Sequence, residues 1–196
     1  MQRRRTQAER QAATRAALIA AARQAFAAQG YAATGTETVV RAAAVTRGAL
    51  YHHFADKQAL FAVVFETVAA EVLAAIEAAA TDAPSALAAL RRGSEAFLAA
   101  ALAPATRRIY LIDAPAVIGW AQWREIDGRY AMGALRRGVD AALAATPRPG
   151  LDAEAVTCLL SGALNEAALW LAESGDGGER LKTSFGLLLD GLFPAA

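Results

Sequence analysis

The stretch Thr46-Arg47-Gly48-Ala49-Leu50-Tyr51-His52-His53-Phe54 determines how the rest of the chain is interpreted. A threonine at its start can cap a helix, because its side-chain oxygen accepts a backbone N–H. Leu50 and Phe54 lie four residues apart, so both can face a core from one side of that helix. The other side then presents small, polar and aromatic residues. We therefore expect a short helix with an exposed functional face.

A second short helix is predicted just before this one. Thr34-Gly35-Thr36-Glu37 fits a capping box that opens a helix through about residue 43, and Ala44-Val45 forms a brief turn. Two short helices joined by a tight turn form a helix-turn-helix, whose second helix enters the DNA major groove. There Arg47 can bond a guanine bidentately, Gly48 leaves room for close approach, and the Ala49 methyl can touch thymine.

The region resembles the DNA-binding domain of the TetR (tetracycline-repressor) family. The residues that carry the resemblance, in order and spacing, are Gly30-Tyr31-Ala32-Ala33-Thr34, Val39, Ala42, Ala43, Val45, Thr46 through Phe54, Asp56-Lys57, Leu60 and Phe61. It implies a dimeric, DNA-binding transcriptional regulator that uses no cofactor. Two positions depart from the pattern: Ala44 stands where the turn usually has Gly, and Gly35 stands where a hydroxyl is common.

The resemblance also assigns roles to individual side chains. It implies backbone contacts for Thr36, Tyr51, His53 and Lys57, and base contacts for Arg47, Ala49 and His52, with Thr46 and Gly48 completing the predicted DNA-binding set. For several of these residues the alternative is that the side chain makes no contact with DNA. An arginine on a helix is often only solvated, and either histidine can be packed or exposed without a role. The arm Arg3-Arg4-Arg5 can follow phosphates or a minor groove, or can be a tail without function.

Caps and hydrophobic periodicity predict an all-α fold in two parts. Residues 1–57 form a three-helix DNA-binding domain and residues 58–196 a helical ligand-binding and dimerisation bundle. A long helix over about 56–80 links them and is expected to be the only connection that could carry a signal. The expected helices span 6–29, 34–43, 46–54, 56–80, 85–103, 105–113, 115–145, 152–173 and 178–192.

The charge is divided between these parts. Residues 1–57 carry nine basic and three acidic side chains, a net +6, whereas the other 139 residues carry 11 basic and 16 acidic ones, a net −5. This split suggests that the first part binds a polyanion, although a solvated arginine-rich helix face would give the same net charge. The single cysteine, Cys158, suits a reducing cytoplasm. No membrane span is expected.

The last two helices are the expected dimer interface. The helix over 152–173 is apolar around more than one face, which a partner subunit would cover, and its small residues permit close approach. The predicted interface residues are Leu160, Ser161, Gly162, Leu164, Phe185, Leu188 and Leu189. Burial within a single chain is the alternative.

An effector pocket is expected in the same part of the chain. Trp120 and Trp123 lie one turn apart and could line an apolar cleft, although aromatic core packing explains them equally well. The predicted ligand-binding residues are Phe97, Tyr110, Asp113, Trp120, Trp123, Tyr130 and Asn165. The expected effector is a small apolar or aromatic molecule.

These features predict a repressor that a small molecule releases from a roughly palindromic operator. The alternative is a DNA-binding protein of the same fold that needs no effector; an open cavity of about 300 Å³ or more would favour the sensor, and a filled one the alternative. A helical metalloenzyme would need histidine or carboxylate ligands at helical spacing, and no histidine follows His53. Neither catalytic nor metal-binding residues are therefore predicted.

Overall fold

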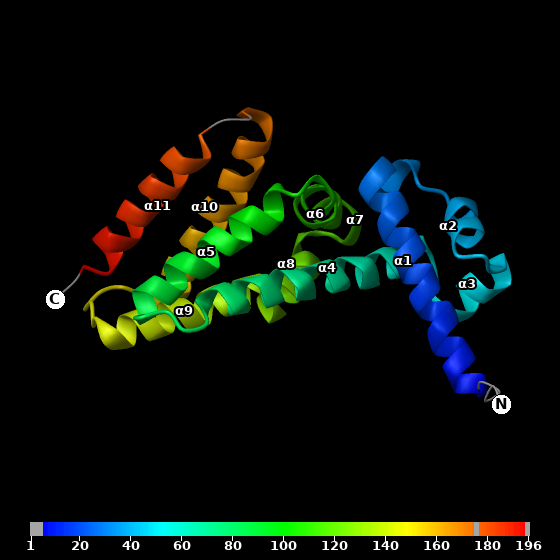
Figure 1. The fold of residues 1–196 in the computed structure, drawn as a ribbon, viewed down its shortest axis with the longest axis horizontal. Coiled ribbons are helices and arrows are strands. Elements are labelled where there is room, and N and C mark those ends of the chain that lie inside the picture. The colour runs from blue at the N-terminus through cyan, green and yellow to red at the C-terminus, as the bar shows by residue number, and fades with distance from the viewer. Residues whose placement is uncertain (1–5, 175–176, 195–196) are drawn as a thin grey trace.

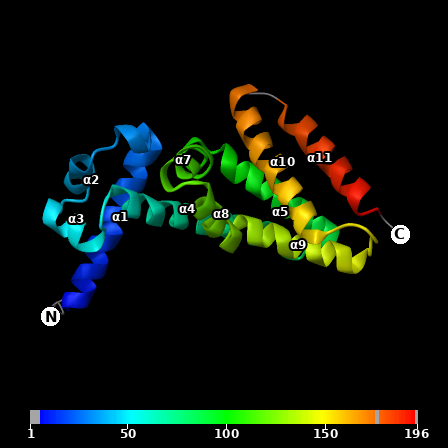
Figure 2. The same ribbon diagram turned by 180° about the vertical axis from the view of Figure 1, so that it is seen from behind.

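The structure, a computed structural model, describes residues 6–174 and 177–194 and is helical with no strand in those ranges. The molecule is elongated (Figures 1 and 2). This confirms the predicted all-α fold. The elements in order are α1 (Gln7–Ala33), α2 (Thr36–Ala42), α3 (Arg47–His53), α4 (Lys57–Ala80), α5 (Ala86–Leu102), α6 (Pro104–Arg107), the π-helical segment η1 (Arg108–Asp113), α7 (Ala114–Ile118), α8 (Trp120–Arg129), α9 (Ala131–Ala145), α10 (Ala153–Ser174) and α11 (Gly178–Leu192).

Helix α1 begins at the predicted capping box. The backbone N–H of Glu9 donates to the Thr6 hydroxyl at 3.2 Å, and the backbone N–H of Thr6 donates to the Glu9 carboxylate at 2.7 Å. The helix was predicted to stop before Gly30. Gly30 indeed leaves helical geometry, with φ +80°, but one further turn follows and α1 bends there instead of ending. A positive φ of this size suits glycine because it has no Cβ.

Two local predictions in the helix-turn-helix need correction or completion. Thr34 does not cap α2: its hydroxyl donates backwards to the Gly30 carbonyl at 2.7 Å, and Gly35 occupies the cap position without a side-chain acceptor. Ala44 takes the left-handed conformation, with φ +53°. The turn therefore keeps the geometry that glycine would favour, and the alanine there is strained.

Helix α4 connects the two ends of the molecule (Figure 1). Asp56 caps its start, and the Asp56 carboxylate accepts the backbone N–H of Ala59 at 2.7 Å as predicted. Its first turns pack against α1, and the remainder packs against η1, α7, α5 and α9. The apolar stripe on α4 is buried along its whole length, and its members are Leu60, Phe61, Val64, Phe65, Val68, Ala69, Val72 and Ile76.

The continuous helix predicted over 115–145 is wrong. Gly119, with φ +81°, separates α7 from α8, and Tyr130 leaves helical geometry between α8 and α9. Just before this, η1 widens the helix at residues 108–113, so that Ala114 donates to the carbonyl of Ile109, five residues back. Pro115 follows at once and cannot donate a backbone N–H, which accounts for irregular helical geometry here.

The far end of the molecule is a bundle in which α5 is central. It packs against α4, α9 and α10, and α11 covers one side of it. Arg91 on α5 holds α11 through an ion pair of 2.5 Å with Asp190. Helix α11 returns antiparallel to α10 on the outside of this bundle (Figure 2).

Candidate DNA-binding surface and effector pocket

Helix α3 is anchored by one face and free on the other. The Thr46 hydroxyl accepts the backbone N–H of Ala49 at 3.1 Å, so the predicted cap is present. Leu50 is fully buried and Phe54 is 4% exposed, which fixes the helix on the core. The side chains at the surface on the opposite face are Arg47, Tyr51 and His52, with His53 half-buried beside them.

Arg47 is held only loosely in the free protein. Its guanidinium lies 3.4 Å from a Glu37 carboxylate oxygen and 5.6 Å from the centre of the Tyr51 ring. The Arg47 and Glu37 side chains are 65% and 64% exposed, and an ion pair this exposed contributes little free energy. Arg47 can therefore leave Glu37 for a stronger bidentate partner.

Gly48 is not required by the protein's own packing. A Cβ placed on it would meet only the Thr46 hydroxyl, at an ordinary 3.8 Å. Glycine inside a helix destabilises it relative to alanine by about 0.5–1 kcal/mol. The absence of an internal reason for glycine favours an external one, close approach of another molecule to this face.

The structure gives Lys57 a role within the chain. Its ammonium donates to the carbonyls of Tyr31, at 3.0 Å, and Thr34, at 3.1 Å, and lies 4.0 Å from the centre of the Tyr31 ring. Two of its three N–H donors are therefore used to join the end of α1 to the start of α4. Thr36, also expected near DNA backbone, is half-buried in the first turn of α2. The arm Arg3-Arg4-Arg5 lies outside the described residues.

The bend in α1 is gripped by η1, a contact that the sequence did not indicate. The backbone N–H of Tyr31 donates to the Asp113 carboxylate at 2.8 Å, and the Arg108 guanidinium donates to the carbonyl of Ala28 at 3.1 Å. Asp113 is thus placed against the DNA-binding domain and not in a pocket. Helix α4 had been expected to be the only link between the two ends of the molecule. The contact between η1 and α1 is a second link.

A pocket of about 260 Å³ lies among α4, α5, α8, α9 and α10. Two of the predicted ligand-binding residues, Phe97 and Asn165, line it. The walls are otherwise mainly apolar, and the lining residues are Ile76, Glu77, Ala80, Ala89, Leu90, Gly93, Ser94, Phe97, Asp127, Ala131, Met132, Ala134, Leu135, Arg137, Gly138, Ser161, Leu164 and Asn165. The cavity is open, and its volume is somewhat below the roughly 300 Å³ that we expect of an effector sensor.

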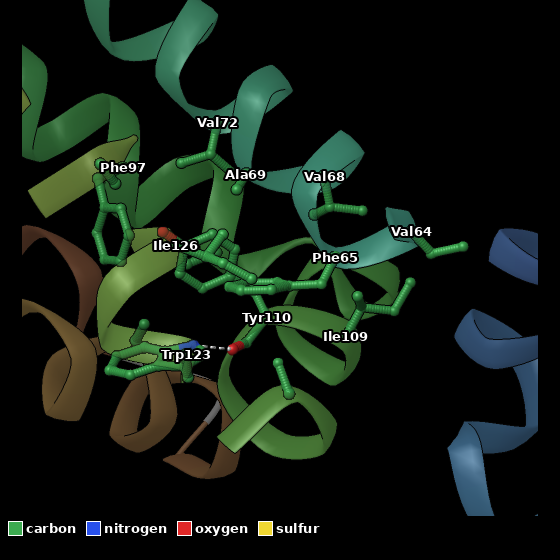
Figure 3. Packing of buried hydrophobic residues seen from close by; sticks show 14 of the residues in the cluster. Val64, Phe65, Val68, Ala69, Val72, Phe97, Ile109, Tyr110, Trp123 and Ile126 are labelled. Carbon is green, nitrogen blue, oxygen red and sulfur yellow. Dashed lines mark hydrogen bonds between the residues drawn. The ribbon is translucent and has the colours of Figure 1, made fainter. Parts of the chain in front are cut away.

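The other predicted aromatic residues do not line this pocket. Trp123 and Tyr110 are each 1% exposed and pack in the core, where the Trp123 indole N–H donates to the Tyr110 carbonyl at 3.0 Å (Figure 3). Trp120 is 64% exposed and stacks on Trp123 from outside, with ring centres 4.8 Å apart. Tyr130 is half-buried at the junction of α8 and α9. Core packing, the alternative, is what the structure shows for Trp123 and Tyr110, whereas Trp120 lies at the surface and fits neither interpretation.

Asp127 is the buried charge that the sequence analysis missed. It is 3% exposed, accepts the Tyr110 hydroxyl at 2.5 Å, and lies 3.6 Å from the Arg124 guanidinium. Burial raises the pKa of Asp127, while the Tyr110 hydrogen bond and Arg124 act against this rise. Burial also raises the pKa of Tyr110. One signal was available: Asp127 follows the buried Trp123 by four residues and so shares its helix face.

The arrangement matches known regulators in both halves. Residues 18–64 match the bacterial regulatory proteins of the tetR family, and residues 87–192 match the tetracyclin repressor-like C-terminal domain. A TetR-family transcriptional regulator from Pectobacterium atrosepticum is 36% identical, with 97% of this chain and 99% of that chain covered and a TM-score of 0.77. The chain belongs to the TetR family.

More distant structures share the fold alone. RolR, solved in complex with the ligand resorcinol, is 18% identical with a TM-score of 0.71, and covers 93% of this chain and 90% of its own. FadR of Bacillus halodurans, a fatty acid degradation regulator, is 16% identical with a TM-score of 0.74, covering 89% and 93%. No curated protein sequence matches the chain. TetR-family proteins are DNA-binding regulators, generally not enzymes.

Family members bind DNA as dimers, and the predicted interface has to be redrawn by burial. Five of its members are covered by their own chain: Leu160, Ser161, Leu164, Phe185 and Leu189. The reason is that α10 packs against α5 and α9 of the same chain. Gly162 and Leu188 are at the surface as an interface requires. The structure adds two exposed leucines that were not predicted, Leu159 and Leu187, which are 73% and 67% exposed.

Two helices of this TetR-family chain, α4 and α10, are long and apolar enough to cross a membrane by length and composition alone. This differs from the expectation that no segment of the chain is long and apolar enough to span a membrane. In the structure each helix packs against α5 and α9, so its apolar residues serve the protein core. A core helix of a soluble protein has the same composition, and the two helices give no argument for a membrane.

Proposed function

We propose that the chain is a repressor that binds a roughly palindromic operator as a dimer and is released by a small molecule. The observation that carries this proposal is the pairing of two features at opposite ends of α4. One is the free face of α3 with its loosely held Arg47. The other is the open 260 Å³ pocket. At 260 Å³ the cavity is smaller than the roughly 300 Å³ expected of a sensor, but it is open and mainly apolar with a few polar groups, as small-molecule sites are.

In this proposal α3 enters the major groove. Arg47 reads a guanine, Ala49 and His52 contact neighbouring bases, and Gly48 lets the helix approach. The residues proposed to contact the DNA backbone are Thr36, Tyr51, His53 and Lys57, with Thr46 capping the helix. Such a protein works where the chromosome is, so we also propose a cytoplasmic location.

Effector control needs a ligand that favours one spacing of the two α3 helices. A dimer engages both half-sites only if these helices are about 34–36 Å apart. A ligand that binds better to a state with another spacing lowers operator affinity, and operator DNA lowers ligand affinity by the same factor. The resorcinol bound by RolR makes small phenols reasonable first compounds to screen.

The DNA-binding half is tested by selecting bound duplexes from a random pool. We expect a palindromic site and an affinity that falls steeply between about 50 and 200 mM salt, because phosphate contacts release counterions. Arg47→Ala should relax the preference at one base pair per half-site and weaken binding by about 1–3 kcal/mol. Arg136→Ala on α9, a surface arginine paired with Asp140, is the matched control and should change neither.

The regulatory half is tested by titrating pocket ligands against the operator complex. A ligand that binds the free protein but leaves operator affinity unchanged would support the alternative, a DNA-binding protein without an effector. A flat salt response at a bound site would argue against the DNA-binding surface itself.

A further inference from the structure

The pocket has one polar end, and this end sets the chemistry of what can bind. Three polar lining residues are almost fully buried, Asp127, Ser161 and Ser94, and Asn165 is half-buried. The Ser94 hydroxyl already donates to the carbonyl of Leu90 at 2.8 Å, whereas Asp127 and Ser161 both contact Arg124. The walls leading away from them are formed by aliphatic and aromatic side chains, including Leu90, Phe97 and Leu135. A ligand that fills this space must be mostly apolar, with its polar group at one end.

Asp127 has an acceptor site to spare. An ionised carboxylate offers about four lone-pair directions. The Tyr110 hydroxyl takes one at 2.5 Å, the backbone N–H of Met132 donates to the carboxylate, and Arg124 approaches to 3.6 Å. A group that donates one hydrogen bond can therefore still be received from the pocket side.

The neighbours of Asp127 can complete the same contact. Ser161 accepts an N–H from Arg124 at 3.3 Å, which leaves its own hydroxyl hydrogen to donate. Asn165 makes no hydrogen bond to the described residues, so its carboxamide keeps both donors and an acceptor. A hydroxyl group fits this set because it can donate to Asp127 and accept from Ser161 or Asn165 at once.

The charges around the pocket cancel at each end. Asp127 is paired with Arg124 inside, and at the solvent side Glu77 is paired with Arg137 at 3.2 Å. An anionic ligand would have to lie beside the Asp127 carboxylate, and a cationic ligand would have to compete with Arg124 for that carboxylate. The pocket therefore favours an uncharged ligand.

We propose that the pocket binds a neutral, mostly apolar molecule that carries one hydroxyl group, and that Asp127 receives the hydrogen of that hydroxyl. The cavity limits its size. An engineered cavity of about 150 Å³ holds benzene, so the 260 Å³ present here holds roughly ten non-hydrogen atoms. This inference rests on the proposed function, in which the pocket is the effector site, and it names the class of effector.

The test compares matched compounds by calorimetry on the full-length protein. 4-Propylphenol and 1-nonanol have the required size, and their isomers 4-ethylanisole and methyl octyl ether are ethers of the same atom count that cannot donate. We expect each hydroxyl compound to bind at least about tenfold tighter than its ether, because a site built to pair a hydroxyl is left with an unpaired polar group by the analogue. 4-Propylbenzoate and 4-propylbenzylammonium should bind more weakly still.

Asp127→Asn tests the residue. Its amide oxygen stays with the Tyr110 hydroxyl and its NH₂ faces the ligand, so the hydroxyl and ether compounds should bind within about threefold of each other. Asp113→Asn makes the same change outside the pocket and should keep the preference. If Asp127→Asn does not fold, a structure of the unaltered protein with 4-propylphenol decides, since the phenol oxygen must lie within hydrogen-bond distance of the Asp127 carboxylate.

Several outcomes overturn the inference: ethers that bind as tightly as the hydroxyl compounds, tighter binding of a charged analogue, a preference that survives in folded Asp127→Asn, or no binding by any compound. Operator release is measured in parallel. Release by an ether or a charged compound would leave the proposed function standing and remove this inference. Selective binding of the hydroxyl compounds without operator release would do the opposite.

Discussion

At the scale of single residues, the DNA-binding half contains two small residues whose fit is informative. Gly48 lies inside a helix where nothing in the chain requires glycine. Ala44 lies in a left-handed turn that glycine would fit better. Gly48 lowers the stability of its helix, and the reason for glycine there lies outside the chain. Ala44 is strained, and no contact within the chain explains the alanine.

Gly48→Ala should separate stability from function. We expect the free energy of unfolding to rise by about 0.5–1 kcal/mol, because alanine favours the helix. Operator affinity should fall by about tenfold or more, about 1.4 kcal/mol, because the added methyl meets the floor of the major groove. Urea unfolding and operator titration measure the two effects. Gly128→Ala on α8, where added atoms also meet open space, should gain stability without losing affinity.

Ala44→Gly should stabilise the protein. The left-handed conformation costs an alanine about 1–2 kcal/mol, and the greater freedom of glycine in the unfolded chain offsets about 0.5–1 kcal/mol of the relief. We expect a net gain of about 0.5–1 kcal/mol in urea unfolding. Ala42→Gly, two residues earlier in the exposed last turn of α2, should lose a similar amount. A loss at Ala44 as well would mean that its φ is not positive in solution.

At the scale of helices, local signals predicted most of the fold. The caps at Thr6, Thr46 and Asp56 were correct because each pairs a side chain with a backbone N–H three residues away, which sequence alone specifies. The stretch between 104 and 131 was predicted poorly. Its form depends on the positive φ of Gly119 and on contacts of η1 with α1, and neither leaves a periodic pattern.

The grip of η1 on α1 gives a prediction at this scale. Asp113→Ala removes the acceptor of the Tyr31 backbone N–H, and a hydrogen bond to a charged group contributes about 1.5–3 kcal/mol. Amide exchange at Tyr31 should accelerate, and the free energy of unfolding should fall by about 1–2 kcal/mol. Asp140→Ala, which breaks only a surface ion pair with Arg136, should change each very little. Unchanged exchange at Tyr31 would show that this contact is not maintained in solution.

At the scale of the whole molecule, the sequence indicated that the N-terminal part binds DNA, but it did not indicate where in the C-terminal part the pocket lies. The charge split and the helix-turn-helix pattern placed DNA binding at the N-terminal end. The two tryptophans led us to predict the pocket beside Trp120 and Trp123. The cavity is instead lined largely by small and aliphatic residues from separate helices. Which aromatic residue fills the core and which lines a cavity depends on tertiary packing, which residue type cannot reveal. Asp127 was overlooked although its spacing of four residues from Trp123 places it on the same helix face.

The exposed face of α10 and α11 leads to the last prediction. Leu159 on α10 and Leu187 and Leu188 on α11 are 73%, 67% and 47% exposed, and exposed large apolar side chains on two neighbouring helices are candidates for an interaction surface. Gly162 lies at the surface of α10, and a Cβ there meets nothing within 4 Å, so a larger side chain does not disturb the protomer. A glutamate at this position would instead be buried, without a partner, between two copies.

Gly162→Glu should therefore yield a folded monomer that binds one half-site weakly and the full operator no better. Light scattering gives the mass, circular dichroism the helix content, and titration the operator affinity. Gly128→Glu is the matched control, because its Cβ also meets open space but on α8, and it should stay dimeric. A Gly162→Glu protein that remains a dimer with full operator affinity would place the interface on another face, and the exposed leucines would then need a different partner.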